Sequence, residues 1–597
     1  MILRNNATGL ILSIFLISFG CQSVDTETMQ PNEFAKKVSE IIVKETKFDF
    51  EPAIQKFEQD GVYLYDFPSQ EEGIFLARSV VSVRDVEGND FTAYLAVNQQ
   101  AGSLSVFLNG TQVYENTVTK DEYLNHVDYG LFEFQNKIPI DITDGNHQLV
   151  VKYKPLKKGN NRVYLSFIRS DNALPYPGIE VKSPSNKEVF DHYGYWWIGP
   201  LKEGINLKDL IANDVSENQL ISQTAKSVFG KTIRWDIPTL HLVKSLPGWL
   251  TFQNWHYSGG TFLDAMRQVG EQFPNQNYSS YINNHTNFLE DNIDEIEQMR
   301  KDYGLIEGPF GHYFRASLLD DMGMQTVPYI NKIIEMSPQD RDKSLFEYKL
   351  TNRVVDHIMN NASRLPDGTF ARFTPDTMSV WADDLFMGSI VLLKMSELTG
   401  NEEYLNEVVK QVIQFDDYLL DSADNLYWHG WFSRNREHSS TKWGRANGWT
   451  MMTKTELLKA MPKNHPKRQE VLEIFKRHAQ GLKEVQSSDG RWHQVLDDPN
   501  TYLETSATAM FVRAFAAGIN EGWLSREEFE SSVELGWKAL TNQFDENGDV
   551  IGIVRGTPIM FSDEEYDNWG TRRNDPRGLG ALLYAAIEVD KMINSSK

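Results

Sequence analysis

Two adjacent acids, Asp383 and Asp384, lie between a tryptophan and an apolar run in the stretch WADDLFMG at residues 381–388. Apolar residues continue after them at helical spacing, so the two acids are predicted to begin a helix whose apolar face is buried. Carboxylates are suited to general acid–base catalysis. They are also common in a first helical turn for a structural reason, because the helix dipole favours negative charge there. The Asp383-Asp384 pair alone does not distinguish a catalytic role from a structural one.

Further polar and aromatic motifs fall in predicted loops and first helical turns, and ordinary amphipathic helix separates them. They are WHY at 255–257, LDDMG at 319–323, WHGW at 428–431, WGRANGW at 443–449, RWHQ at 491–494, YLETSATAMF at 502–511 and NDPRG at 574–578. In a helical fold that brings such loops to one end, these side chains would surround a sugar-binding site.

The residue types in these motifs suit an acidic sugar as the ligand. The guanidinium fork of Arg445 fits a uronate carboxylate, and a structural salt bridge within its loop is the alternative. His429 and His493 could bond sugar hydroxyls or the carboxylate, or could be packed histidines. Trp449 and Trp492 could stack on a sugar ring or belong to the core. No two histidines have metal-ligand spacing, so no metal is predicted.

From about residue 251 to residue 597 the apolar pattern is helical, and no strand-like run interrupts it. Eleven segments carry the pattern: 262–273, 281–299, 322–334, 348–359, 385–398, 404–420, 449–460, 471–485, 505–517, 529–540 and 578–592. A ring of paired helices, an (α/α)6 barrel, fits this count and length if one further helix is hidden. An α-solenoid is the competing all-helical arrangement.

Residues 51–185 are predicted to form a β-sandwich of jelly-roll type, because short runs rich in β-branched and aromatic residues alternate there with turn signals. Asn109-Gly110 is a strong hairpin signal between two of these runs. No tryptophan occurs before Trp196. A stacking platform built on tryptophan is therefore not expected in this domain, and structural support is favoured over sugar binding. Residues 186–250 are predicted to be a connector.

The N-terminus has the features of an export signal. Residues 1–20 combine Arg4 with a short apolar core, and Cys21 is the single cysteine of the chain. This arrangement resembles a bacterial lipoprotein signal, so we expect an exported protein that is lipid-anchored to a bacterial membrane, on its periplasmic or outer face. Ordinary signal cleavage nearby is the alternative. Residues 21–50 are predicted to be a tether.

The composition limits the partners of the chain. Its 597 residues suggest two or more domains, and its net charge of −24 argues against a nucleic-acid partner, which would require a basic surface. That charge does not exclude an acidic oligosaccharide, because a few local arginines can bind one. No oligomeric state is indicated.

Three of the motifs resemble, in combination and in order, those of glycoside hydrolase family 105, the unsaturated rhamnogalacturonyl hydrolases. They are the WxDDLFM helix start, the WGRxNGW loop and the ETSxTAMF helix. The unsaturated glucuronyl hydrolases are similar more loosely. The resemblance covers roughly residues 250–595 and implies an (α/α)6 barrel, in agreement with the helical pattern.

The resemblance also implies roles for individual residues. Asp383 matches the general acid and base of the family, and Asp320 matches the acid that assists it. Asp384 would then orient the site or cap the helix, and Trp443 and Asn447 would contact the substrate. Enzymes of the family protonate the C4=C5 double bond of a non-reducing-end uronic acid, and water adds at C5. The resulting hemiketal opens and releases the aglycone, without a metal or cofactor.

Three departures from the family pattern keep other functions open. Ala446 replaces a common glycine, about 250 residues precede the barrel, and Arg572 and Arg573 add a basic pair near the expected site. One alternative is a saturated terminal uronide as substrate, attacked by β-elimination of water or by a glucuronidase reaction. Another, suggested by the β-domain and the lipoprotein-type signal, is a non-catalytic sugar-binding lipoprotein.

Overall fold

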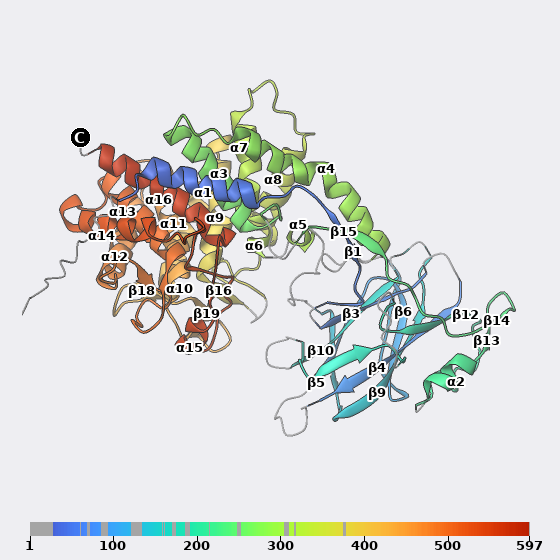
Figure 1. Cartoon of the computed structure of the whole chain (residues 1–597). Coiled ribbons are helices and arrows are strands. Elements are labelled where there is room, and N and C mark those ends of the chain that lie inside the picture. Colours follow the sequence, from blue (N-terminus) through green and yellow to red (C-terminus); the bar gives the residue numbers. More distant parts are fainter. Residues whose placement is uncertain are drawn as a thin grey trace, which may run out of the picture.

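The computed structural model describes residues 28–59, 61–68, 72–84, 93–120, 134–157, 159, 161–169, 175–185, 192–213, 215–247, 252–303, 310–315, 318–373 and 378–595 (Figure 1). The expected signal peptide and Cys21 lie outside these residues. Two bodies are visible, one built of helices and one built of antiparallel sheets. None of the helices described is long and apolar enough to cross a bilayer.

Six inner helices form a closed ring. Each packs against the next, and the last packs against the first, so the arrangement is an (α/α)6 barrel and not an open solenoid. In chain order they are α3 (Tyr257–Gln272), α6 (Leu319–Met322) with its continuations η1 (Met324–Thr326) and α7 (Val327–Glu335), α9 (Ala382–Thr399), α11 (Gly444–Ala460), α13 (Thr505–Asn520) and α16 (Pro576–Asn594). The predicted helical barrel is confirmed.

A second layer of helices covers this ring. Each outer helix packs on an inner one. They are α4 (Ser279–Tyr303), α8 (Phe346–Asp356), α10 (Glu402–Leu419), α12 (Arg468–Glu484), α14 (Arg526–Thr541) and α1 (Pro31–Glu45), and the short helices α5 (Gly311–Arg315) and α15 (Asp563–Asp567) lie in connecting loops. The helix missing from the predicted eleven is therefore α1, which comes from the far end of the chain.

The position of α1 corrects the predicted tether over residues 21–50. Residues 31–45 form a helix that packs on α16 and buries Phe34 in the core of the barrel. The ring of Phe34 lies 4.8 Å from that of Trp537 and 5.4 Å from that of Phe544. The apolar periodicity of this 15-residue helix is clear in the sequence. The sequence does not show, however, which distant helix it packs against.

A close backbone contact positions the short helix α6 beside α9. A Cβ atom at Gly323 would lie 1.9 Å from the carbonyl oxygen of Met387 on α9. Only glycine can be accommodated at that distance, and the helix breaks there before η1 begins. The break sets the first turn of α6, which carries Asp320, near the first turn of α9, which carries Asp383.

The N-terminal body is a β-sandwich of two antiparallel sheets around one shared core. The five-stranded sheet has the order β2 (Glu58–Gln59), β3 (Val62–Asp66), β10 (Arg162–Arg169), β5 (Ala93–Gln99), β8 (Asn136–Ile140). The six-stranded sheet has the order β11 (Ile179–Lys182), β4 (Ile74–Val83), β9 (Gly145–Lys154), β6 (Gly102–Leu108), β7 (Thr111–Val118), and β12 (Trp196–Leu201) also pairs with β4.

Strand β12 corrects the predicted connector over residues 186–250. Because it pairs with β4, the sheet extends into that segment and carries Trp196 and Trp197. The same segment returns to pair β15 (Leu242–Ser245) with β1 (Glu51–Ile54) beside the helical body. The two bodies also meet where Arg162 donates a hydrogen bond of 2.9 Å to the carbonyl of Arg300 on α4.

Candidate active site

The polar motifs of the sequence lie at the N-terminal ends of the inner helices. Asp320 and Asp383 occupy first turns, while His256, Glu504 and Asp575 are N-cap residues whose side chains accept hydrogen bonds from the backbone. Tyr257, at the start of α3, is close enough to feel the charges of arginines on α11 and α16 and of Asp320 and Asp383. These ends therefore surround one common region, as the sequence predicted.

Asp383 is paired with His429, and both lie beside strand β16 (Ser379–Trp381). This strand pairs with β19 (Gly430–Phe432), and the amide of Ala382 donates to the carbonyl of His429 at 3.0 Å. The imidazole Nε2 lies 3.4 Å from Oδ2 of Asp383, and Nδ1 lies 2.5 Å from the hydroxyl of Tyr566. His429 is fully buried, whereas 15% of the Asp383 side chain is exposed. A bound molecule could therefore reach the carboxylate.

Arg372 connects two other carboxylates. Its Nε and Nη2 atoms donate to Oδ2 and Oδ1 of Asp384 at 2.9 and 2.8 Å, and Nη2 also reaches Oδ2 of Asp320 at 3.1 Å. The guanidinium carbon lies 4.2 Å from the centre of the Trp381 ring. Asp384 is buried in this bidentate pair, while 23% of the Asp320 side chain is exposed. Asp384 is thus a partner of Arg372, whereas the carboxylate of Asp320 is partly exposed, like that of Asp383.

The environments of the two exposed acids shift their pKa values in opposite directions. Burial raises the pKa of Asp320 to about 7, helped by the charges of Asp384 and Asp383 and opposed by Arg372. Burial also acts to raise the pKa of Asp383, but the adjacent imidazole of His429 and the nearby arginines outweigh it, and this pKa is lowered. Near neutral pH, Asp320 therefore holds a proton for part of the time and Asp383 is ionised.

Several polar atoms at this position are buried and have no hydrogen-bond partner within the described part of the chain. They are Oδ1 of Asp320, Oδ2 of Asp383 and Nε2 of His429. The last two are within ion-pair distance, but they lack hydrogen-bond geometry. Buried polar atoms normally have partners, so these three indicate a place for a polar ligand.

Arg445 does not take the position expected for a carboxylate ligand. Its side chain is fully buried, and its Nη1 and Nη2 atoms donate to the carbonyls of Val554 and Arg555 at 2.6 and 2.7 Å. Buried Arg445 instead fixes the start of the loop at residues 555–560. Its charge still acts on Asp383 and lowers the pKa of that carboxyl.

Other predicted contacts are also structural. Trp449 and Trp492 are fully buried, and Trp443 is 1% exposed. Trp449 packs on Phe386, with ring centres 4.7 Å apart, so the core interpretation holds for these tryptophans. The side chain of Asn447 is buried, donating to two backbone carbonyls and accepting from the amide of Tyr427. His493 is partly exposed, with Nδ1 2.5 Å from the carbonyl of Thr501.

The structure adds residues that the motifs did not indicate, including Arg372 and Tyr566. A third is Arg555, whose guanidinium lies 3.9 Å from the centre of the Trp569 ring. Within the described residues no carboxylate pairs with it, and its Nε is without a hydrogen bond. Both Arg555 and Arg445 act electrostatically on the partly buried Tyr502, which places Arg555 beside the loop that Arg445 fixes.

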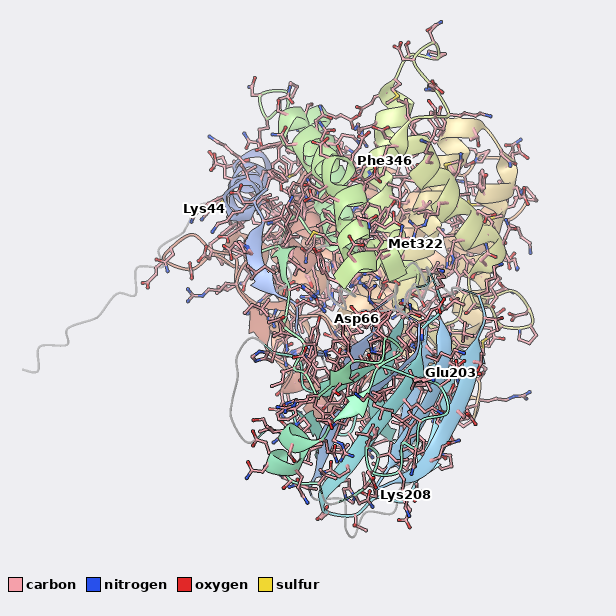
Figure 2. All side chains as sticks on the ribbon, turned by 90° about the vertical axis from the view of Figure 1, so that its right-hand side faces the viewer. Lys44, Asp66, Glu203, Lys208, Met322 and Phe346 are labelled. Carbon is pink, nitrogen blue, oxygen red and sulfur yellow. The ribbon has the colours of Figure 1, made fainter. Side chains whose placement is uncertain are left out.

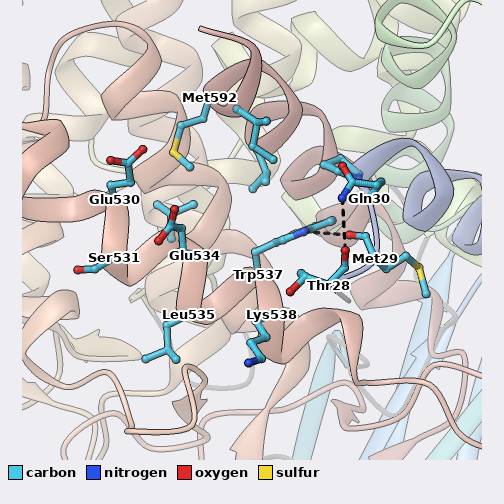
Figure 3. Close-up of a pocket in the computed structure, with 14 residues that line it drawn as sticks. Thr28, Met29, Gln30, Glu530, Ser531, Glu534, Leu535, Trp537, Lys538 and Met592 are labelled. Atoms are coloured by element: carbon cyan, nitrogen blue, oxygen red, sulfur yellow. Dashed lines mark hydrogen bonds between the residues drawn. The ribbon is translucent and has the colours of Figure 1, made fainter. Parts of the chain in front are cut away.

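A cavity of about 640 Å³ elsewhere in the barrel is not this site. It lies between α14, the end of α16 and the chain that enters α1 (Figure 3). The indole of Trp537 donates to the carbonyl of Met29 there, at 3.3 Å. None of the acids described above lines it. Among the described residues, no group of three or more metal-ligating side chains is present either.

Comparison with known proteins shows that residues 244–593 match Glycosyl Hydrolase Family 88. The unsaturated rhamnogalacturonyl hydrolase YesR of Bacillus subtilis (strain 168) is 28% identical over 244 residues, which are 40% of this chain and 69% of that protein.

Two proteins named unsaturated 3S-rhamnoglycuronyl hydrolase are also similar. That of Alteromonas sp. (strain LOR) is 30% identical over 35% of this chain, and that of Formosa agariphila is 31% identical over 36%. The matches span 50% and 58% of the length of these two relatives. A solved structure of a possible member of family GH105 from Salmonella enterica has a TM-score of 0.49 at 19% identity, covering 63% of this chain and 92% of that one.

Proposed function

Because the chain belongs to glycosyl hydrolase family 88, we propose that it removes an unsaturated uronic acid from the non-reducing end of oligosaccharides made by a polysaccharide lyase. Rhamnogalacturonan- and ulvan-type oligosaccharides are the proposed substrates. The names of the similar hydrolases support this class. The observation that carries the proposal is the pair of partly exposed acids, Asp383 and Asp320, whose pKa values are shifted in opposite directions.

In the proposed reaction Asp383 exchanges protons with the substrate and Asp320 holds the proton of the empty site. A uronate bound beside Asp383 adds a negative charge, and a like charge raises the pKa of a carboxyl. Asp383 would then be protonated in the complex and could donate to C4 of the double bond. Water adds at C5 and returns its proton to the Asp383 carboxylate. The hemiketal opens to a keto acid and the free alcohol of the aglycone, so no proton is consumed overall.

We propose Arg555 as the partner of the uronate carboxylate, in place of Arg445. Its guanidinium is held over Trp569 and has no carboxylate partner among the described residues, so its planar fork is available for a bidentate contact. Asp383 is ionised in the empty site, and a cation nearby would limit the repulsion between it and the substrate. Tyr566 and His429 would orient Asp383 from the other side.

The direct test is ultraviolet absorbance of the C4=C5 double bond during incubation with unsaturated oligosaccharides from rhamnogalacturonan and ulvan lyases, followed by mass spectrometry. Loss of absorbance with release of a shortened oligosaccharide is the expected result. Unchanged absorbance with every such substrate would contradict the proposal. A rise in absorbance from a saturated oligosaccharide would show a dehydratase instead, and release of a saturated uronic acid would show a glucuronidase.

The pKa of Asp320 predicts the pH dependence of the reaction. Its proton is present below about pH 7 and is lost as pH rises through that value. We therefore expect kcat/KM to fall on the alkaline side of about pH 7. Asp320→Asn should lower kcat/KM by about 10²-fold and remove this alkaline limb, because the group that titrates is gone. An unchanged limb in the folded variant would show that another group holds the proton.

Substitution of Arg555 tests the carboxylate contact. We expect Arg555→Lys to raise KM about tenfold with a small change in kcat, because an ammonium group keeps the charge but not the bidentate fork. Arg573→Lys is the matched control, since Arg573 is exposed and pairs with Asp545 on the surface. Equal KM values for Arg555→Lys and the wild type would exclude Arg555 as the carboxylate partner.

A further inference from the structure

A second polar cavity, of about 510 Å³, lies at the junction of the β-sandwich and the helical barrel. Figure 2 shows Asp66, one of the residues that line it, at this junction between the sheets and the helices. Neither Asp383 nor Asp320 lines it. We propose that this cavity is a binding site for a neutral sugar unit of an oligosaccharide, separate from the catalytic acids and independent of the proposed function.

One partly exposed ring of the kind that stacks on sugar rings, that of Trp197, lines the cavity. Trp197 on β12 is partly exposed there and is supported from behind by Phe75, with ring centres 5.4 Å apart. Tyr195, two residues earlier, is 1% exposed and supports the cavity wall: its hydroxyl accepts from the amide of Asp66 at 3.0 Å and donates to the carbonyl of Asp66 at 3.2 Å. Rigid aromatic rings bind the C–H face of a sugar with little loss of side-chain entropy.

One hydroxyl in the cavity wall is left unpaired by the described residues. Tyr193 is 3% exposed, and its hydroxyl forms no hydrogen bond within that part of the chain. Its backbone amide, by contrast, donates at 3.0 Å to the carbonyl of Pro238, which also lines the cavity. A buried hydroxyl without a partner is unfavourable, and a polar ligand that enters the cavity would satisfy it.

The charges around the cavity favour a neutral ligand over a uronate. Carboxylates of Asp66, Asp236 and Asp302 line it, and they can accept hydrogen bonds from sugar hydroxyls. The cations that line it are already engaged: Arg162 lies 3.3 Å from Asp66 and also donates to the barrel, and Lys301 pairs with Glu297 on α4 at 3.0 Å. An anionic sugar would meet these carboxylates without a free guanidinium or ammonium group among the described lining residues.

The remaining titratable group at the cavity is His241, which is exposed and packs on the ring of Tyr303 at 4.8 Å. The cavity volume lies within the range of about 300–1,000 Å³ that is usual for small-ligand sites, which often occur where two domains meet. One or two sugar rings fit a volume of this size. A site here would hold the neutral part of an oligosaccharide on the protein.

Ligand-observed NMR of the full chain with the methyl glycosides of glucose, galactose, xylose and rhamnose, and with methyl glucuronide, tests the proposal. We expect at least one neutral glycoside to bind with a Kd in the millimolar range and more tightly than the glucuronide. Trp197→Leu should weaken that binding at least tenfold. Tyr193→Phe, which removes only the unpaired hydroxyl, should weaken it about threefold or more and is the safer variant for folding.

Two controls separate this site from the catalytic one. Asp383→Asn should leave the binding of the neutral glycoside unchanged, and so should Tyr114→Phe, a matched tyrosine on β7 that does not line the cavity. The proposal is overturned if no neutral glycoside binds at 50 mM, if binding is insensitive to both Trp197 and Tyr193, or if the glucuronide binds more tightly. Because none of these readouts requires turnover, they do not depend on the reaction proposed above.

Discussion

Replacement of Asp383 by asparagine is expected to lower kcat by about 10²–10⁴-fold while KM changes little. The amide keeps the shape of the side chain and its place beside His429, but it can neither donate nor accept the reacting proton. The measurement is initial-rate kinetics on an unsaturated oligosaccharide, with circular dichroism to confirm that the variant is folded.

Asp384→Asn is the matched control for this experiment, because it changes the neighbouring carboxylate of the same helical turn. Asp384 is 2% exposed and is occupied by Arg372, so it has no free path to the substrate. We expect Asp384→Asn to reduce stability and to lower kcat less than Asp383→Asn does. The assignment fails if a folded Asp383→Asn variant keeps near wild-type turnover while Asp384→Asn is inactive.

Arg372→Gln should have the second large effect, on stability as well as on activity. Arg372 is the cation shared by Asp384 and Asp320, and all three side chains are largely shielded from water. Removal of one partner from a buried ion pair typically costs about 3–5 kcal/mol, because the remaining charge is left uncompensated. Thermal or urea unfolding at pH 7.5 should show a loss of this size, and kcat should fall with it as the acids lose their relative positions.

The sign of the pH dependence identifies the cause of that loss. Burial already raises the pKa of Asp384, and without Arg372 it would rise further. A carboxyl whose pKa is higher in the folded than in the unfolded state destabilises the fold most at pH values above its folded-state pKa, and the penalty shrinks as pH falls from that pKa towards the unfolded-state pKa. The deficit should therefore shrink between pH 7.5 and pH 5.

A double variant gives an independent check of the same explanation. Arg372→Gln combined with Asp384→Asn should recover most of the lost stability but not the activity. A deficit that is constant with pH, or that the double variant does not reduce, would point to lost packing on Trp381 instead of lost charge compensation.

The barrel could be predicted from the sequence because its helices carry a local signal. The periodic apolar segments and the motifs at their first turns both depend on neighbouring residues, and the structure has helices at all the predicted segments. The roles of the arginines could not be predicted in this way. Arg445 lies inside a prominent motif but is used by backbone carbonyls. Arg372 lies outside any motif, and only the fold brings it to the acids. Arg555 also lies outside any motif.

The two errors in domain organisation have a related cause. Composition placed a boundary before Trp196, yet β12 pairs with β4, more than a hundred residues earlier in the chain. A strand partner at that distance leaves no trace in a local pattern, because pairing depends on register and burial in the finished sheet. The same correction places Trp197 in the β-sandwich, although the sequence boundaries had left this domain without a tryptophan.

The helix α1 also has a consequence for how the protein is made. It is synthesised first, but Phe34 packs against Trp537 and Phe544, about 500 residues later in the chain. At a synthesis rate of about 5–20 residues per second, α1 would emerge roughly 25–100 s before its binding surface exists. During that interval its apolar face is exposed, while the β-sandwich can already fold. Closure of the barrel is therefore a late step that joins the two ends of the chain, and a chaperone that covers α1 until then would increase the yield of folded protein.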